Sequence, residues 1–323
     1  MSPALLDLDP ATYQRHDLHS TDRLFPETNC YTDVWIELLH ALGWEPRAAL
    51  AFCVGVDFEG DQWTFFKPPP GDLEALYGAE IFELQIYRTV EEHVVEQLAL
   101  GRPVIAEVDA YYLPDTAGRS YREQHEKTGI AVTAIDPGAE LMRYFHGTGL
   151  HELSGDDYRN ALRLGREFSP DVLPPYVEFV RLDRLPAHSG AALHKIARAL
   201  LRSHVDRLPA TNPVERFGAR LVTDLPLLDG NPEAYHRYAF ATVRQCGAAW
   251  EAASSLLEWL DTNGAATAAA GSAFASLATE SKTLLFKLAR AAASSRPFDP
   301  EPAIESLAAT WSEAARLLNA SDG

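Results

Sequence analysis

The sequence changes character near Pro174-Pro175, and this change limits the possible folds more than any other feature. Before it, short apolar runs of strand length alternate with helical patterns and turns. From Gly190 onward the chain is alanine-rich, and prolines separate long segments whose apolar residues recur at helical spacing. We therefore predict an α+β protein with a mixed domain over residues 1–180 and an all-helical domain over residues 181–323. Each part is long enough to bury its own core.

A predicted helix begins with Cys30 and ends at Gly43. Its apolar residues recur at i, i+4, i+7 and i+8 from Val34, and Thr28 or Asn29 can cap its start. A thiol in the first turn lies at the positive end of the helix dipole, which favours the thiolate, the nucleophilic form of cysteine. The alternative interpretation of Cys30 is a buried structural cysteine.

Three further strands are predicted around a histidine. The first covers residues 103–109, and a loop of roughly fifteen residues follows it. The second strand begins at His125 and runs to Ile135. After a turn at residues 136–140, the third strand returns over residues 141–146. We also predict a buried strand over Ala48–Val56. Among the C-terminal segments, residues 231–262 are predicted to form one helix.

The order of these elements resembles that of the papain-like thiol fold, in which a helix carrying the cysteine precedes an antiparallel sheet carrying the histidine. This resemblance implies that Cys30 is the nucleophile and His125 the general base. The group that orients His125 is left open between Asp109, at the end of the preceding strand, and His146, at the end of the returning strand. Asp136 ranks below both because an extended strand separates it from His125. If none of these orients His125, the pair works as a dyad.

Several short segments carry a second, closer resemblance: Thr28–Tyr31, Trp35–Glu37, Phe58–Lys67, Leu113–Gly118 and His125–Thr128, with Tyr235–Phe240 in the helical half. In these segments the chain resembles a bacterial family whose members tend to be encoded beside amino acid:carrier-protein ligases. The first half of that family is similar to the N-terminal domain of the butirosin-type acyltransferase, which moves an acyl group off a carrier protein.

This resemblance implies an aminoacyl or acyl transferase that takes its group from a phosphopantetheine thioester on a carrier protein, through a thioester on Cys30. The implied partners are the carrier protein and an amino acid:carrier-protein ligase, and the phosphopantetheine belongs to the carrier, so the chain needs no cofactor of its own. The alternatives are a papain-like peptidase or amidase, a thioesterase, and a non-catalytic partner of the carrier and ligase.

Three residues are candidates for substrate binding. Asn29 could add a side-chain amide to the oxyanion donors. Glu107 shares a strand face with Asp109 and could bind the α-ammonium of an aminoacyl group, although a solvated strand end is the alternative. Trp63 could line the pocket or belong to the core. No metal site is predicted, because His146 and His151 have no third ligand nearby.

The composition limits the partners and the compartment. A formal net charge of −18 and an isoelectric point near 5.0 argue against nucleic acid and against an anionic membrane surface. No signal peptide and no apolar run of membrane-spanning length are visible, and three cysteines without a CxxC motif suggest a reducing cytoplasm. Basic sides of the segments 190–207 and 266–293 could bind an acidic carrier protein, although a solvated helix face is the favoured interpretation.

Overall fold

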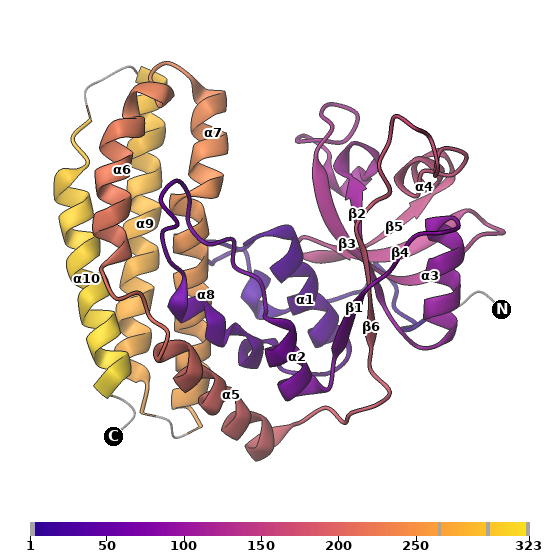
Figure 1. Cartoon of the computed structure of the whole chain (residues 1–323), viewed down its shortest axis with the longest axis horizontal. Helices are drawn as coiled ribbons and strands as arrows, with labels where there is room; N and C mark the ends of the chain where they lie inside the picture. Colours follow the sequence, from indigo (N-terminus) through magenta and orange to yellow (C-terminus); the bar gives the residue numbers. More distant parts are fainter. Residues whose placement is uncertain (1–3, 264–265, 295–297, 321–323) are drawn as a thin grey trace. The chain divides into compact units, whose positions relative to one another are not determined.

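The computed structural model describes residues 4–263, 266–294 and 298–320, so the outermost residues of the two predicted domains lie outside it. Within these ranges the chain contains a six-stranded antiparallel sheet followed by a helical C-terminal region (Figure 1). This arrangement confirms the predicted α+β class.

The chain forms two compact units, and each is discontinuous in sequence. The first contains the sheet, and the second contains the C-terminal helices. The chain passes from the first unit to the second after His188, close to the predicted boundary at residue 180. Two N-terminal segments, however, also belong to the second unit. The first unit comprises Met1–Ser20, Asn29–Pro46 and Pro69–His188, and the second comprises Thr21–Thr28, Arg47–Pro68 and Ser189–Gly323.

The sheet of the first unit has the strand order β1-β6-β2-β3-β4-β5, and all neighbouring strands are antiparallel. The three strands predicted around His125 correspond to β2, β3 and β4. The strands are β1 (Glu80–Glu83), β2 (Val104–Asp109), β3 (Lys127–Asp136), β4 (Leu141–His146), β5 (Gly149–Ser154) and β6 (Val177–Arg181).

Different helices cover the two faces of this sheet. On one face, α3 (Val90–Ala99) buries its apolar side against a cluster that includes Ile130 and Tyr144. On the other face, α1 (Cys30–Ala41) packs on β3 and β4. Phe145 points to this second face, since successive side chains of a strand alternate, and its ring lies 5.2 Å from that of Tyr13. The central strands β3 and β4 are therefore covered on both faces.

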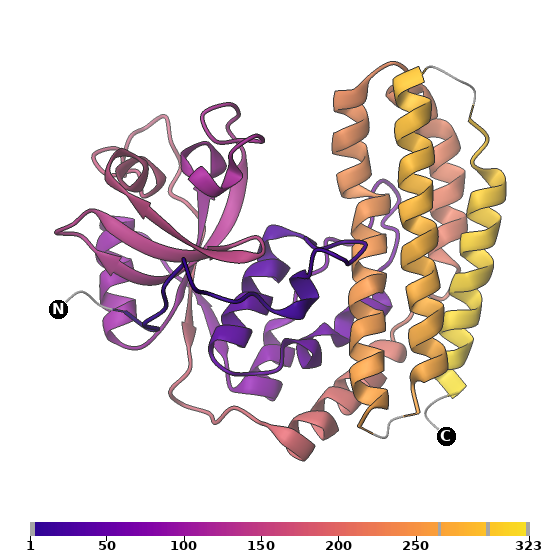
Figure 2. The same cartoon turned by 180° about the vertical axis from the view of Figure 1, so that it is seen from behind.

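The second unit is built from long helices, of which α6, α8, α9 and α10 run side by side (Figures 1 and 2). Trp63 belongs to the core of this second unit, although it lies shortly before α2 (Pro70–Tyr77), a helix of the first unit. No helix in the described ranges is both long and apolar enough to cross a membrane. The helices are α5 (Gly190–Val205), α6 (Pro213–Leu228), α7 (Pro232–Ala241), α8 (Val243–Asp261), α9 (Ala268–Ser294) and α10 (Glu301–Ala320).

Two predicted elements are wrong. The apolar run Ala48–Val56 is not a strand but belongs largely to a 3-10 helix, η2 (Pro46–Gly55), because a continuous apolar run fits a buried helix as well as a buried strand. The single helix predicted over residues 231–262 is two helices, α7 and α8. The chain breaks at Thr242, whose backbone angles of φ −118° and ψ −103° lie outside the helical region.

Candidate active site

Cys30 is the first residue of α1, and it is partly exposed. The helix start is well defined, because the side-chain oxygen of buried Asn29 accepts the N–H of Thr32 at 3.0 Å. Helical bonding begins with the N–H of Asp33, which donates to the carbonyl of Asn29. The backbone N–H of Cys30 therefore has no helical carbonyl partner and is suited to stabilise an oxyanion.

The other two cysteines are poor nucleophiles. Cys53 and Cys246 are buried, and burial raises the pKa of both thiols well above the usual range. Because the thiolate is the reactive form, these two residues are suited to packing and not to catalysis. Cys30 is the one cysteine with access to solvent, and it lies at a helix N-terminus.

The structure brings His125 and Asp109 together. Nδ1 of His125 lies 2.6 Å from Oδ2 of Asp109, so Nδ1–H donates to the carboxylate and leaves Nε2 as the basic nitrogen. The N–H of Tyr111 donates to the other oxygen of Asp109 at 3.1 Å, and the Tyr111 ring stacks on the imidazole with centroids 4.3 Å apart. These contacts fix both the tautomer and the plane of His125, whose side chain is 67% exposed.

This pair and the first turn of α1 lie on the same face of the sheet. Glu107 and Asp109 alternate with the core residues of β2 and therefore point to the α1 side. Glu178 of β6 lies opposite Ile105 in the register and shares this face. The hydroxyl of Tyr31, next to Cys30, donates to the Glu178 carboxylate at 2.8 Å, which holds the start of α1 over β2 and β6.

Cys30 and His125 are not hydrogen-bonded to each other in the part of the chain that the structure describes. Catalytic hydrogen bonds are often long in ligand-free sites and tighten only when substrate binds. The arrangement is therefore a thiol at a helix N-terminus and an oriented imidazole on the same sheet face, each with access to solvent.

His146 occupies a different environment. It follows Tyr144 by two residues, so it points to the α3 side of the sheet, away from Asp109. Its Nδ1 lies 2.5 Å from Oδ2 of Asp115, and its Nε2 lies 2.8 Å from the hydroxyl of Thr128. Burial raises the pKa of Asp115, but the hydrogen bond and charge of His146, together with smaller effects of His151 and Tyr144, outweigh burial and lower this pKa. Both nitrogens of His146 are therefore engaged away from His125.

The remaining predicted residues are placed as follows. Glu107 accepts from the ammonium of Lys127 at 2.7 Å, so an exposed cation already occupies the position proposed for a substrate ammonium. Trp63 is 1% exposed in the core of the second unit, against Phe217 and Trp250, and offers no surface to a substrate. Among the described side chains, no three His, Cys, Asp or Glu residues are grouped to hold a metal ion.

Two contributors to this site are absent from the sequence-based candidates. Tyr111 stacks on His125, and Glu178 anchors Tyr31 beside the cysteine. Tyr111 could have been identified from the sequence, because it lies two residues after Asp109, where the loop turns back toward the next strand. Glu178 had no such signal, because the pairing of β6 with β2 joins segments about seventy residues apart in the chain.

Comparison with known protein families gives two matches, which together cover most of the chain. Residues 14–182 match the DUF1839 N-terminal domain, and residues 190–320 match the DUF1839 C-terminal domain. No curated protein matches the sequence.

Proposed function

The chain belongs to the DUF1839 family, and we propose that it is a cysteine-dependent acyltransferase with a papain-like catalytic domain. In this proposal Cys30 takes an aminoacyl group from the phosphopantetheine thioester of a carrier protein and passes it to a second nucleophile. The observation that carries the proposal is the hydrogen-bonded Asp109–His125 pair on the sheet face that also holds the start of the Cys30 helix.

Each group has a defined role in the reaction. His125 Nε2 accepts the thiol proton, and the Cys30 thiolate attacks the thioester carbonyl. The backbone N–H of Cys30 donates to the oxyanion of the tetrahedral intermediate. When the bond from the carbonyl carbon to the pantetheine sulfur breaks, the leaving thiolate takes the proton from His125. The acceptor then attacks the Cys30 thioester and gives its proton to His125, and the released Cys30 thiolate takes this proton back.

Asp109 is the group proposed to orient the base. Its carboxylate holds the Nδ1–H of His125 and stabilises the imidazolium that forms during each proton transfer. Carrier-protein binding is proposed for the basic side of α5, where Lys195 and Arg198 are exposed. This surface would suit an acidic partner on a chain that is otherwise strongly acidic.

The direct test is mass spectrometry of the intact protein after incubation with an aminoacylated carrier protein. We expect a mass gain equal to the aminoacyl group, and no gain for Cys30→Ala. A protein without an adduct beside a fully loaded carrier would contradict the transferase and favour a non-catalytic partner. Unloading of the carrier that depends on Cys30 but leaves no adduct would instead identify a thioesterase.

Glu107 provides a test of the aminoacyl specificity. In the proposed complex the α-ammonium replaces Lys127 Nζ at the Glu107 carboxylate, since the Lys127 side chain is 72% exposed and is displaced at little cost. Glu107→Gln should slow transfer of glycyl groups about tenfold, because a charge-assisted hydrogen bond is lost, and should leave acetyl transfer unchanged. Lys127→Gln is the matched control and should not slow glycyl transfer. Equal losses for glycyl and acetyl groups would contradict this role.

A further inference from the structure

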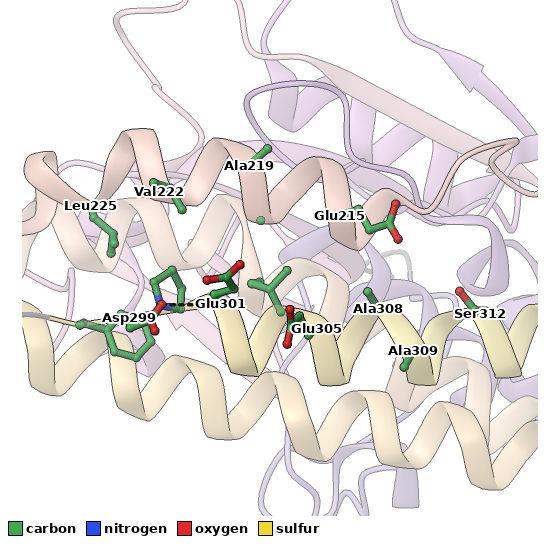
Figure 3. Close-up of a pocket in the computed structure, with 14 residues that line it drawn as sticks. Glu215, Ala219, Val222, Leu225, Asp299, Glu301, Glu305, Ala308, Ala309 and Ser312 are labelled. Atoms are coloured by element: carbon green, nitrogen blue, oxygen red, sulfur yellow. Dashed lines mark hydrogen bonds between the residues drawn. The ribbon is translucent and has the colours of Figure 1, made fainter.

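A groove runs between α6 and α10 of the second unit, and its volume is about 890 Å³ (Figure 3). One face of α6 and one face of α10 form its walls, together with the segment that leads into α10. The two helices come close at Gly218, where a side chain would collide with Ile304. The lining residues are Glu215, Gly218, Ala219, Val222, Leu225, Phe298, Asp299, Pro300, Glu301, Ile304, Glu305, Ala308, Ala309 and Ser312.

The floor of this groove is apolar, and its rim is acidic. Val222, which lines it, is 59% exposed, a high value for an aliphatic side chain in a helix that packs on others. Four carboxyl groups surround this floor, and no described residue forms an ion pair with them. They belong to Glu215, Asp299, Glu301 and Glu305.

The cations of α6 do not neutralise this rim. Arg216 bonds to the Phe58 carbonyl and to Asp57, and Arg220 bonds to Asp224 at 2.8 Å. Neither arginine lines the groove. The charges that α6 and α10 present to the groove are therefore all negative, and a ligand that fits it must bring its own cations.

The dimensions of the groove suit a helix. The lining residues of α6 span Glu215 to Leu225, which corresponds to about 15 Å along a helix axis, and those of α10 span a similar length. An apolar strip of this length between rows of carboxylates complements an amphipathic helix of about three turns with lysine or arginine beside its apolar face.

We propose that the α6/α10 groove binds a basic amphipathic helix of a partner protein. The apolar face of that helix covers Val222 and Ile304, and its cations pair with the rim carboxylates. The net charge of −18 favours the approach of such a partner from solution. This docking surface does not depend on the chemistry proposed for Cys30, because it requires only the geometry and charge of the second unit.

The test uses the full-length protein and a fluorescent peptide of about fourteen residues, built from leucine and lysine in a helical amphipathic pattern. Fluorescence anisotropy should show saturable binding to the wild-type protein. The double variant Glu301→Gln/Glu305→Gln should bind about five- to tenfold more weakly, since two exposed ion pairs are lost. The control variant Glu123→Gln/Glu258→Gln removes two exposed carboxylates that do not line the groove and should bind as the wild type does.

A second variant separates docking in the groove from simple charge attraction. Val222→Glu adds a carboxylate but removes an apolar contact from the floor. Docking in the groove predicts weaker peptide binding, whereas charge attraction alone predicts stronger binding. The proposal would be overturned by tighter binding to Val222→Glu, by equal weakening in the control variant, or by equal affinity for a peptide of the same composition without the amphipathic pattern. Circular dichroism spectra identical to the wild type establish that each variant is folded.

Discussion

Replacement of His125 by alanine is expected to slow acylation of Cys30 by about 100- to 10,000-fold, the usual contribution of a positioned general base. The imidazole is 67% exposed and its main fixed contacts are Asp109 and Tyr111, so its removal should barely change the stability of the fold. The rate of adduct formation with an aminoacyl-pantetheine thioester measures this effect without a contribution from carrier-protein binding. Full activity of His125→Ala would mean that another group deprotonates Cys30.

Asp109 and His146 were equal candidates for the group that orients His125, and the same assay separates them. Asp109→Asn should slow acylation about ten- to a hundredfold, because the amide cannot stabilise the imidazolium and does not enforce the Nδ1–H tautomer. His146→Gln should leave the rate almost unchanged, because His146 contacts Asp115 and Thr128 on the opposite face of the sheet. A rate loss in His146→Gln at normal stability would reverse this assignment.

The sequence could predict the approach of Asp109 to His125, because a loop between two antiparallel strands returns the chain to the point it left. It could not choose between Asp109 and His146. That choice depends on which sheet face each side chain occupies, and Asp115, which holds His146, comes from an irregular loop that no periodicity predicts.

The sequence also could not predict which of the two units residues 47–68 belong to, because this depends on long-range packing. The segment 47–68 precedes all six strands of the sheet in the chain, yet it belongs to the helical unit. Trp63 explains this placement, since its ring packs against Trp250 and Phe217, which lie more than 150 positions later in the sequence. Local patterns specify each helix and strand but carry no information about which distant aromatic residues will share a core.

Residues 13–19, which precede α1 in the chain, are joined to this helix by a buried ionic network. His19 is fully buried between two carboxylates of α1: its Nδ1 contacts Glu37, and its Nε2 lies 3.3 Å from Asp33. Glu37 is also fully buried and accepts from the hydroxyl of Tyr13 at 2.5 Å and from the N–H of His16 at 3.1 Å. This network connects residues 13–19 to the helix that carries the candidate nucleophile.

The charge of His19 follows from this environment. Burial lowers the pKa of the imidazole, but the hydrogen bonds and charges of Asp33 and Glu37 outweigh burial and raise it to about 9 from the usual 6.5. A group whose pKa is higher in the folded state stabilises the fold fully below its unfolded pKa and loses that contribution as the pH rises through the folded value. His19 should therefore contribute roughly 3 kcal/mol to the free energy of unfolding at about pH 6, and almost none above about pH 9.

His19→Gln should accordingly lower the free energy of unfolding by about 3–5 kcal/mol at about pH 6, because it leaves two buried carboxylates without their cation. The difference between wild type and variant should shrink by roughly 3 kcal/mol as the pH rises to about 9.5, since the wild-type imidazole is then neutral. Urea denaturation at both pH values, with hydrogen exchange at the amides of α1 to localise the effect to the first unit, measures both quantities. His125→Ala is the matched control, because it removes an exposed histidine from the same unit. A difference between wild type and His19→Gln that stays constant with pH would mean that His19 is neutral in the folded protein.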